Sequence, residues 1–334
     1  MQPLLLMPHP MYTPAQYQKL VNDYLSSMPY DRKPAKLYEP VRYELSLGGK
    51  RIRPVLMLMA YHLLKEDVER ILPVAIGLET YHNYTLVHDD IMDKAELRRG
   101  NPTLHVKLEE NQALLASEVM VLAAFQGIMK ADKTCSHRLL EVFCEIALEI
   151  SEGQQLDIEF ENRDDVTADE YIEMIRLKTS VLLACALQLG AIQAGASEQD
   201  CDLIYEFGEK FGLAFQLQDD LLDVYGDAKT FGKNIGGDIL CNKKTYMLIN
   251  ALALAEGEVA DELRKWITLA DFDPKEKIQA VTAIYDRLGI RQICLEKIHE
   301  CYDLAKDAWL KMSFPLEKKQ VLWDYVESML YRTF

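Results

Sequence analysis

Two long apolar stretches of the sequence carry the same acidic pattern near their ends, and this pairing constrains the fold more than any other feature. Residues 74–93 carry the pattern D-D-x-x-D at 89–93, and residues 199–225 carry it at 219–223. Both stretches are rich in helix formers and are too long for ordinary strands. The sequence therefore predicts two long, largely buried helices, each with carboxylates near its C-terminal end.

The rest of the chain is also typical of helices. Gly and Pro number 16 and 12 in 334 residues, below the usual share of about 12%. Apolar periodicity predicts further helices over 54–64, 111–130, 139–161 and 168–195, with several shorter helices over 244–334. No β-alternating block with regularly spaced turns appears. We expect an all-α protein with one large helical bundle forming a single domain over residues 1–334.

The net charge and the cysteine pattern limit the kinds of partner and the cellular compartment that we expect for this protein. The formal net charge of −16 argues against a nucleic-acid-binding surface and against docking on anionic lipid. The seven cysteines are scattered without a C-x-x-C pair, which is typical of reduced thiols in a cytoplasm. Residues 1–10 do not resemble a signal peptide, and no uncharged run is long enough for stable membrane insertion. We expect a soluble cytoplasmic protein.

The acidic pattern itself indicates a metal site. On a helix, Asp89 shares a face with Asp93, and Asp219 shares one with Asp223. Like charges repel there and are also unfavourable at the negative end of the helix dipole. A cation should compensate, and Mg²⁺ accepts one or two carboxylates together with water and phosphate oxygens. The alternative interpretation of a single motif is a solvated helix end, but two copies on apolar helices favour a magnesium site. The apolar surroundings further indicate a hydrophobic substrate with a charged head group.

Several basic residues lie at positions where they could bind the charged head group of the substrate. Arg98 and Arg99 follow the first acidic motif on a short loop, a pairing that suits phosphate. A second basic group, Lys50, Arg51 and Arg53, lies between two glycines and the helix-starting Pro54. The remaining candidates are spread along the chain: His82 lies two turns before Asp89, Lys178 and Thr179 lie in an apolar helix, and Lys233 and Lys243 follow the second motif. Any one of these taken alone could be an ordinary solvated or core residue.

Taken together, these motifs resemble the trans-isoprenyl diphosphate synthase family, which includes farnesyl and geranylgeranyl diphosphate synthases. The resemblance runs from Gly48 to Thr245 through ordered blocks: GGKRIRP, HNYTLVHDDIMDKAELRRGNPT, SEGQQLD, KTS, FQLQDDLLD and FGKNIGGDILCNKKT. It implies the isoprenoid synthase fold, a helical bundle around a deep central cavity, and a homodimer. The implied substrates are an allylic diphosphate and isopentenyl diphosphate, joined head to tail by a prenyltransferase that uses three Mg²⁺ ions.

The resemblance also implies a role for each candidate residue. Asp89 and Asp93 would bind Mg²⁺ from one wall and Asp219 from the other, with Asp90, Asp220 and Asp223 supporting the cluster, partly through water. Arg98, Lys178 and Lys233 would hold the allylic diphosphate, and Lys50, Arg53, His82 and Arg99 would hold isopentenyl diphosphate. Lys178, Thr179 and Gln216 would face the allylic carbon as positive charge develops. Lys243 matches the last basic position of the family, although Lys244 competes for that role.

Residues before the first motif bear on product length. The growing tail would run along the helix that carries Asp89, at roughly one isoprene unit per turn of about 5.4 Å. Tyr84 and Thr85 lie five and four residues before Asp89, and Tyr81 lies lower. An aromatic floor of this kind resembles short-chain synthases and predicts a C20 product, with C15 as the alternative. Ordinary packing of Tyr81 and Tyr84 is the competing interpretation.

Three other functions fit parts of the sequence. A terpene cyclase also uses an aspartate cluster, but its second metal motif is usually asymmetric. A di-iron bundle needs two Glu-x-x-His motifs, and the chain has them at Glu79–His82 and Glu296–His299. A non-catalytic partner subunit would tend to lose aspartates, whereas both motifs are intact here.

Overall fold

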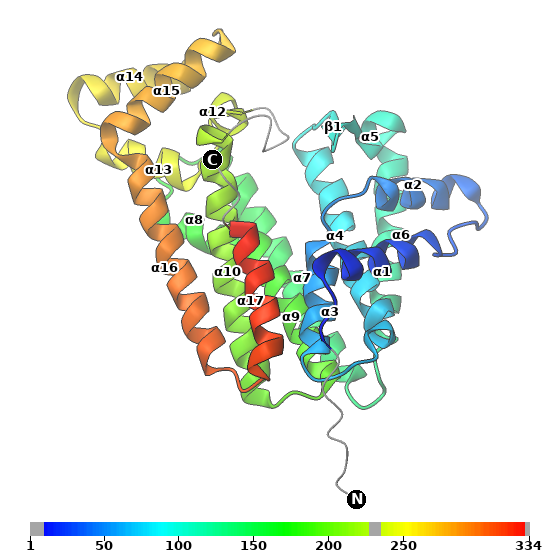
Figure 1. The fold of residues 1–334 in the computed structure, drawn as a ribbon. Helices are drawn as coiled ribbons and strands as arrows, with labels where there is room; N and C mark the ends of the chain where they lie inside the picture. Colours follow the sequence, from blue (N-terminus) through cyan, green and yellow to red (C-terminus); the bar gives the residue numbers. More distant parts are fainter. Residues whose placement is uncertain (1–9, 227–234, 331–334) are drawn as a thin grey trace, which may run out of the picture. The chain divides into compact units, whose positions relative to one another are not determined.

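The computed structural model describes residues 10–226 and 235–330 and is built almost entirely from helices, which confirms the all-α prediction (Figure 1). The first part of the chain forms α1 (Pro14–Ser26), α2 (Ala35–Ser46), α3 (Ile52–His62), η1 (Val68–Ile71), α4 (Leu72–Met92), α5 (Leu104–Lys107), α6 (Glu110–Ile128) and α7 (Ser136–Glu161). The rest forms α8 (Ala168–Ile175), η2 (Arg176–Ser180), α9 (Val181–Ala194), α10 (Glu198–Tyr225), α12 (Gly237–Leu240), α13 (Tyr246–Leu254), α14 (Gly257–Thr268), α15 (Pro274–Leu288), α16 (Ile290–Lys311) and α17 (Leu316–Leu330).

The chain divides into two compact units, and each is discontinuous in sequence. Unit 1 comprises Met1–Glu145, Cys185–Ile204 and Ser313–Leu322. Unit 2 comprises Ile146–Ala184, Tyr205–Met312 and Trp323–Phe334. The organisation as one domain, and the deep central cavity that the resemblance implies, stay predictions.

The predicted long helices form close to their predicted bounds, as α3, α4, α6, α7 and α10. The segment 168–195, predicted as one helix, instead contains a π-helical turn, η2, between α8 and α9. Local sequence explains several ends: Thr13 and Thr167 form capping boxes at the starts of α1 and α8. Gly289 ends α15 in the left-handed conformation that glycine adopts without strain.

Helix α4 packs along α6 within unit 1 (Figure 1). A buried cluster joins these two helices to α2 and α5; its buried members are Tyr30, Val41, Leu45, Val87, Leu104, Ala113, Ala116 and Met120. Val87 lies two residues before Asp89, so the cluster fixes the acidic end of α4. Helix α3 is buried on all sides from Pro54 to His62, as its continuous apolar sequence predicts.

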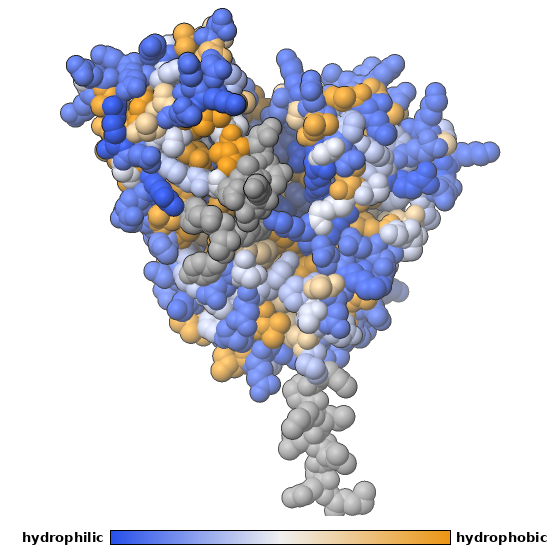
Figure 2. Space-filling view, turned by 45° about the horizontal axis from the view of Figure 1, so that its top comes forward, coloured by the Kyte–Doolittle hydropathy of each residue, from blue (hydrophilic) through white to orange (hydrophobic). Residues whose placement is uncertain are grey.

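One helical stretch, Ala168–Ala194, is long and apolar enough to cross a membrane by length and composition. However, 78% of its most apolar window is buried inside the structure, as in the core helix of a soluble protein. The face of the molecule in Figure 2 is mainly hydrophilic, with apolar side chains in small groups. These observations agree with the predicted soluble protein.

Candidate active site

The first acidic motif lies at the C-terminal end of α4 in unit 1. Asp93 is the residue that caps the helix, and its N–H donates to the Asp89 carbonyl at 2.8 Å. Asp89 is half-buried and Asp93 is exposed, so both carboxylates lie near solvent at the negative end of the helix. Asp90 is buried and accepts two hydrogen bonds from Arg98, each of 2.7 Å. Asp90 therefore orients Arg98, the residue predicted to hold the allylic diphosphate.

Arg98 and Arg99 lie on a short hairpin, where the sequence predicted a loop. Strands β1 (Leu97–Arg98) and β2 (Asn101–Pro102) pair antiparallel, with Arg98 opposite Asn101. Arg99 and Gly100 occupy the turn with φ of 53° and 75°, the positive values that a tight two-residue hairpin turn requires. The hairpin thus places the Arg98 guanidinium next to the acidic end of α4, whereas that of Arg99 reaches the Gly48 carbonyl.

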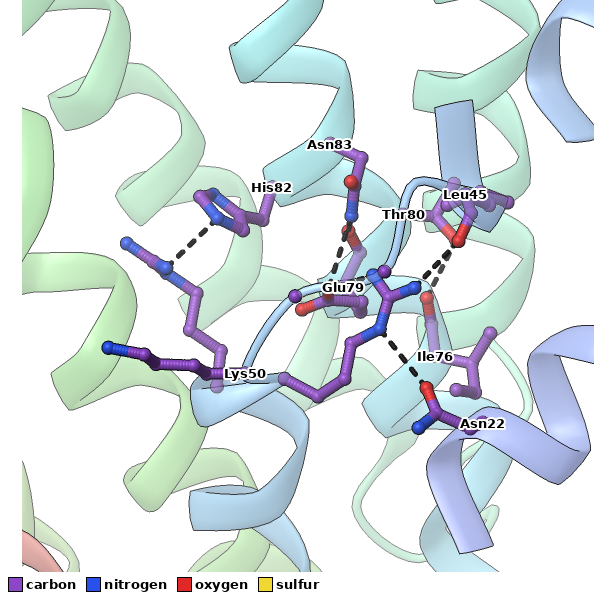
Figure 3. Close-up of polar contacts among 12 residues, drawn as sticks. Asn22, Leu45, Lys50, Ile76, Glu79, Thr80, His82 and Asn83 are labelled. Atoms are coloured by element: carbon purple, nitrogen blue, oxygen red, sulfur yellow. Dashed lines mark hydrogen bonds and ion pairs between the residues drawn. The ribbon is translucent and has the colours of Figure 1, made fainter. Parts of the chain in front are cut away.

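A basic cluster lies one to two turns before the acidic motif. His82 on α4 lies beside Arg53 on α3, with Nε2 3.1 Å from a guanidinium nitrogen, and Figure 3 shows Lys50 on the same side. Burial and then the charges of Arg53 and Arg99 hold the pKa of His82 well below its usual range. A neutral His82 therefore accepts from Arg53. The structure brings three of the predicted isopentenyl diphosphate residues together here, and Arg99 joins them by donating to the Gly48 carbonyl.

Arg53 contains a buried donor atom that could bind an anion. Its Nε atom is buried and has no hydrogen-bond partner among the described residues. Burial lowers the pKa of Arg53 to about 10, so the group stays charged at neutral pH. A buried, charged donor without an acceptor is costly and is the kind of group that a phosphate oxygen satisfies.

The second acidic motif lies near the end of α10 in unit 2 and belongs to a hydrogen-bonded chain. The buried Asp220 accepts from the Tyr171 hydroxyl and, at 2.9 Å, from the Gln216 amide. Gln216 in turn accepts from the Thr179 hydroxyl at 3.2 Å. Burial and the nearby Asp238 raise the pKa of Asp220 to about 7. Thr179 and Gln216, predicted to face the allylic carbon, are therefore in contact, and Asp220 supports them.

Lys178 lies in the π-helical turn η2 and forms a 2.6 Å ion pair with Asp157. The turn is closely packed on two sides. A Cβ on Gly153 of α7 would lie 2.5 Å from the backbone nitrogen of Lys178. A Cβ on Gly212 of α10 would lie 2.6 Å from the Cα of Ser180. Only glycine allows these approaches. Such turns occur frequently at functional sites, where they redirect side chains.

The structure bears on the choice between Lys243 and Lys244. Burial alone would raise the pKa of Asp157, but the charges of Lys243 and Lys178 outweigh it and leave that pKa below its usual range. Lys244 instead pairs with the exposed Asp164 at 3.2 Å. Lys243 therefore lies close enough to affect Asp157, and its assignment as the family's last basic residue stays a prediction. Lys233 lies outside the described residues.

The predicted chain-length residues lie in an aromatic group on α4. Tyr84 is half-buried, and its ring centroid lies 4.5 Å from that of His88 and 5.5 Å from that of Tyr81. Tyr81 is buried and packs edge-on against Phe143 of α7 at 5.1 Å. Thr85 donates to the His82 carbonyl at 2.8 Å. These contacts brace Tyr81 and Tyr84 below the acidic motif.

The acidic residues suit magnesium in their chemistry but do not form a ready-made cage. Among the described residues, no group of three or more His, Cys, Asp or Glu side chains is arranged to hold a metal ion. Hard carboxylate oxygens at two helix ends nonetheless fit Mg²⁺, which keeps water and takes phosphate oxygens from its substrate. Glu79 does not serve as an iron ligand, because its carboxylate accepts from Arg51 and Asn83.

The comparison with protein families decides the identity. A family model described as polyprenyl synthetase matches residues 34–285, which is more than half of the 334 residues. The chain belongs to the polyprenyl synthetase family. It is therefore a prenyltransferase of a family that depends on divalent metal ions, and the cyclase, di-iron and non-catalytic interpretations are set aside.

Relatives within the family have different product names. The short chain isoprenyl diphosphate synthase of Methanocaldococcus jannaschii is 43% identical over 224 residues, covering 67% of this chain and 68% of the relative. The geranylfarnesyl diphosphate synthase of Natronomonas pharaonis is 36% identical over 270 residues, covering 74% and 79%. Both names are those of isoprenyl diphosphate synthases, and only the second names a product.

Solved structures of this family match over almost the whole chain and confirm the isoprenoid synthase fold. A geranylgeranyl pyrophosphate synthase has a TM-score of 0.91 and 40% identity, with 97% of this chain and 100% of that chain covered. The geranylgeranyl pyrophosphate synthase from Corynebacterium glutamicum, complexed with isoprenyl diphosphate and magnesium, has a TM-score of 0.79 and 26% identity, with 96% and 98% covered.

Two supporting residues were missed in the sequence, Asp157 and Tyr171. Asp157 ends the SEGQQLD block and lies one helical turn after Gly153. An acid in a block that resembles the family could have been recognised as a candidate site residue. Tyr171 lies seven residues before Lys178, two helical turns away, but nothing in the local sequence marks it as the partner of Asp220.

Proposed function

We propose that this polyprenyl synthetase joins isopentenyl diphosphate head to tail to an allylic diphosphate, namely dimethylallyl, geranyl or farnesyl diphosphate, and releases geranylgeranyl diphosphate. The observation that carries the proposal is the basic cluster of Arg53, His82 and Arg99. It holds a buried guanidinium donor that finds no acceptor among residues 10–226 and 235–330, about two helical turns from an acidic helix end. Diphosphate binding would satisfy that donor.

In this proposal, two groups of residues bind the two diphosphates. Lys50, Arg53, His82 and Arg99 hold isopentenyl diphosphate. Arg98, oriented by Asp90, and Lys178, oriented by Asp157, hold the allylic diphosphate together with Lys233 and Lys243. Asp89, Asp93, Asp219 and Asp223 would hold the metal ions, which we propose to be three Mg²⁺ per chain. When bound, Mg²⁺ would neutralise the charge that develops on the departing diphosphate.

The protein side chains then control the allylic cation. The guanidinium and ammonium groups stabilise the leaving diphosphate as the C–O bond breaks. Thr179 and Gln216, joined by their hydrogen bond and supported by Asp220, direct oxygen atoms toward the positive charge. The alkene of isopentenyl diphosphate attacks the allylic carbon, and the proton leaves to the released diphosphate. No side-chain nucleophile takes part.

The product length follows from the aromatic group on α4. Tyr84 and Tyr81 lie one and two turns before Asp89 and are braced by His88 and Phe143. A floor at this depth limits the tail to a C20 product, and a shallower floor would give C15. The geranylgeranyl pyrophosphate synthase structure with 40% identity supports C20.

We further propose a cytoplasmic homodimer. Leu115, Leu122 and Met129 follow each other at seven-residue intervals along α6 and its end, so they lie on one face, and each is more than half exposed. An exposed apolar stripe of this kind is typical of a protein interface, and a second copy of the chain is the partner that the family favours. The seven cysteines are unpaired, which supports a reducing compartment.

The test is to incubate the purified chain with Mg²⁺, isopentenyl diphosphate and each allylic starter in turn, and to identify the products by mass. The proposal predicts a C20 diphosphate from every accepted starter. A C15 or C25 diphosphate as the main product would overturn the product assignment. A cyclised hydrocarbon, or no elongated diphosphate from any starter, would overturn the reaction itself.

A further inference from the structure

The loop that joins α2 to α3 is held by residues that lie outside it. The Gly48 carbonyl accepts a hydrogen bond from Arg99. Gln18 of α1 donates to the Gly49 carbonyl at 3.2 Å and approaches the Lys50 carbonyl at 3.4 Å. Gly48 and Gly49 have φ of 78° and 120°, values that glycine adopts readily, so outside contacts and not steric restriction select this backbone path. Three successive carbonyls are therefore fixed by contacts to two other elements.

Arg51 in the same loop is an internal anchor. Its guanidinium donates to Glu79 of α4 at 2.8 Å and to the Leu45 carbonyl at 2.6 Å, and its Nε donates to Asn22 of α1 at 3.3 Å. The Arg51 and Glu79 side chains are each 3% exposed. Arg51 adopts a left-handed φ of 52°, which is strained for a residue with a Cβ. The buried contacts of its side chain offset that strain.

The anchor lies on the opposite side of the loop from the substrate-binding groups. Figure 3 shows Lys50 and His82 to one side of Glu79 and Asn22 to the other. Because Arg51 is committed to Glu79 and Asn22, its neighbours Lys50 and Arg53 are presented on the far side of the loop. The position of α1 and α4 thus determines where those two basic groups lie.

Helix α1 is well placed to fix the position of Lys50 and Arg53. It precedes the segment that the family model matches, 34–285. Tyr17 and Val21 are fully buried, and the Tyr17 hydroxyl bonds to His62 of α3 at 2.6 Å. The helix is thus anchored to the protein by its apolar face. Gln18 and Asn22 project from α1 toward the loop one turn apart.

We propose that α1 is part of the isopentenyl diphosphate site, with Gln18 and Asn22 as positioning residues that act through the loop and through Arg51. This rests on the proposed function, which assigns Lys50 and Arg53 to that diphosphate. Neither residue touches substrate. Their effect is to hold two charged groups in the geometry that a diphosphate needs, since small displacements of binding groups cost affinity.

The test compares Gln18→Ala and Asn22→Ala with the wild type in the full-length protein. Each variant should raise KM for isopentenyl diphosphate about two- to tenfold, the effect of one lost hydrogen bond, and should leave KM for the allylic substrate unchanged. Calorimetric titration with isopentenyl diphosphate should show the same rise in Kd. Asn22→Asp keeps an acceptor for Arg51 and should bind as the wild type does. Lys19→Gln, on the exposed side of α1, is the matched control.

Three outcomes would overturn the proposal while the wild type remains active. One is an unchanged KM for isopentenyl diphosphate in both alanine variants. Another is an equal rise in KM for both substrates, which would indicate general disorder. The third is a matching rise in Lys19→Gln. If the wild-type chain itself does not condense the two substrates, the proposed function fails instead, so the two failures are distinguishable.

Discussion

The buried pair of Arg51 and Glu79 offers a sharp test of how unit 1 is held together. Glu79→Ala would leave the Arg51 guanidinium, 3% exposed, without its anion. Removing one partner of a buried ion pair costs about 3–5 kcal/mol, because the remaining charge stays desolvated. A chain of 334 residues unfolds with an entropy of on the order of 0.7 kcal/mol per kelvin, so the Tm should fall by about 4–7 °C.

The assay is differential scanning calorimetry, supported by urea denaturation. The matched control is Glu262→Ala, which removes the same side chain from an ion pair with Arg287 whose partners are 53% and 43% exposed. That variant should lose less than about 1 kcal/mol. Equal losses in the two variants would refute the reasoning, because burial would then make no difference. The double variant Arg51→Met/Glu79→Leu should lose less than Glu79→Ala alone, since no charge is left unpaired.

Three further predictions test other parts of the structure. Burial and the nearby Asp90 raise the pKa of Glu44 to about 7, so the folded state binds the extra proton and wild-type stability falls as pH rises from about 4.5 to 7. Glu44→Gln should remove that fall, which is on the order of 3 kcal/mol. Denaturation at pH 5 and 8 with chelator present measures it, and identical pH profiles in the wild type and the variant would contradict the prediction. Tyr84→Ala should lengthen the product beyond C20 in a mass assay, and an unchanged product would count against the aromatic floor. Leu122→Glu should convert a dimer to monomers in analytical ultracentrifugation, whereas a dimer that persists would place the interface elsewhere.

Much of the fold follows from sequence patterns that act over short distances. The bounds of α4 and α10 are predictable because apolar runs and the acids at their ends are local features. The contact of Arg53 with His82 was not predicted as such, but both residues were assigned to one ligand, and the structure places them 3.1 Å apart. The family resemblance guided that assignment, since helical spacing alone puts His82 only on the wall near Asp89.

The features that the sequence did not reveal depend on contacts between distant segments. The π-helical turn η2 interrupts the regular α-helical geometry of 168–194, and Gly153 and Gly212 of neighbouring helices approach it closely. Asp90 belongs to the acidic motif, yet its side chain turns inward to Arg98 and not toward solvent. Gln18 shows no motif at all, and its function depends on where α1 packs. Direction and packing of this kind are set by tertiary structure.

We propose that the acidic motifs bind magnesium together with a diphosphate and not as a preformed cage. The most direct measurement counts Mg²⁺ per chain by equilibrium dialysis, with and without a non-hydrolysable allylic thiolodiphosphate. We predict about three ions per chain with the analogue and weak binding without it, because Mg²⁺ takes part of its oxygen shell from substrate phosphates. Three tightly bound ions in the absence of the analogue, or none in its presence, would contradict the account.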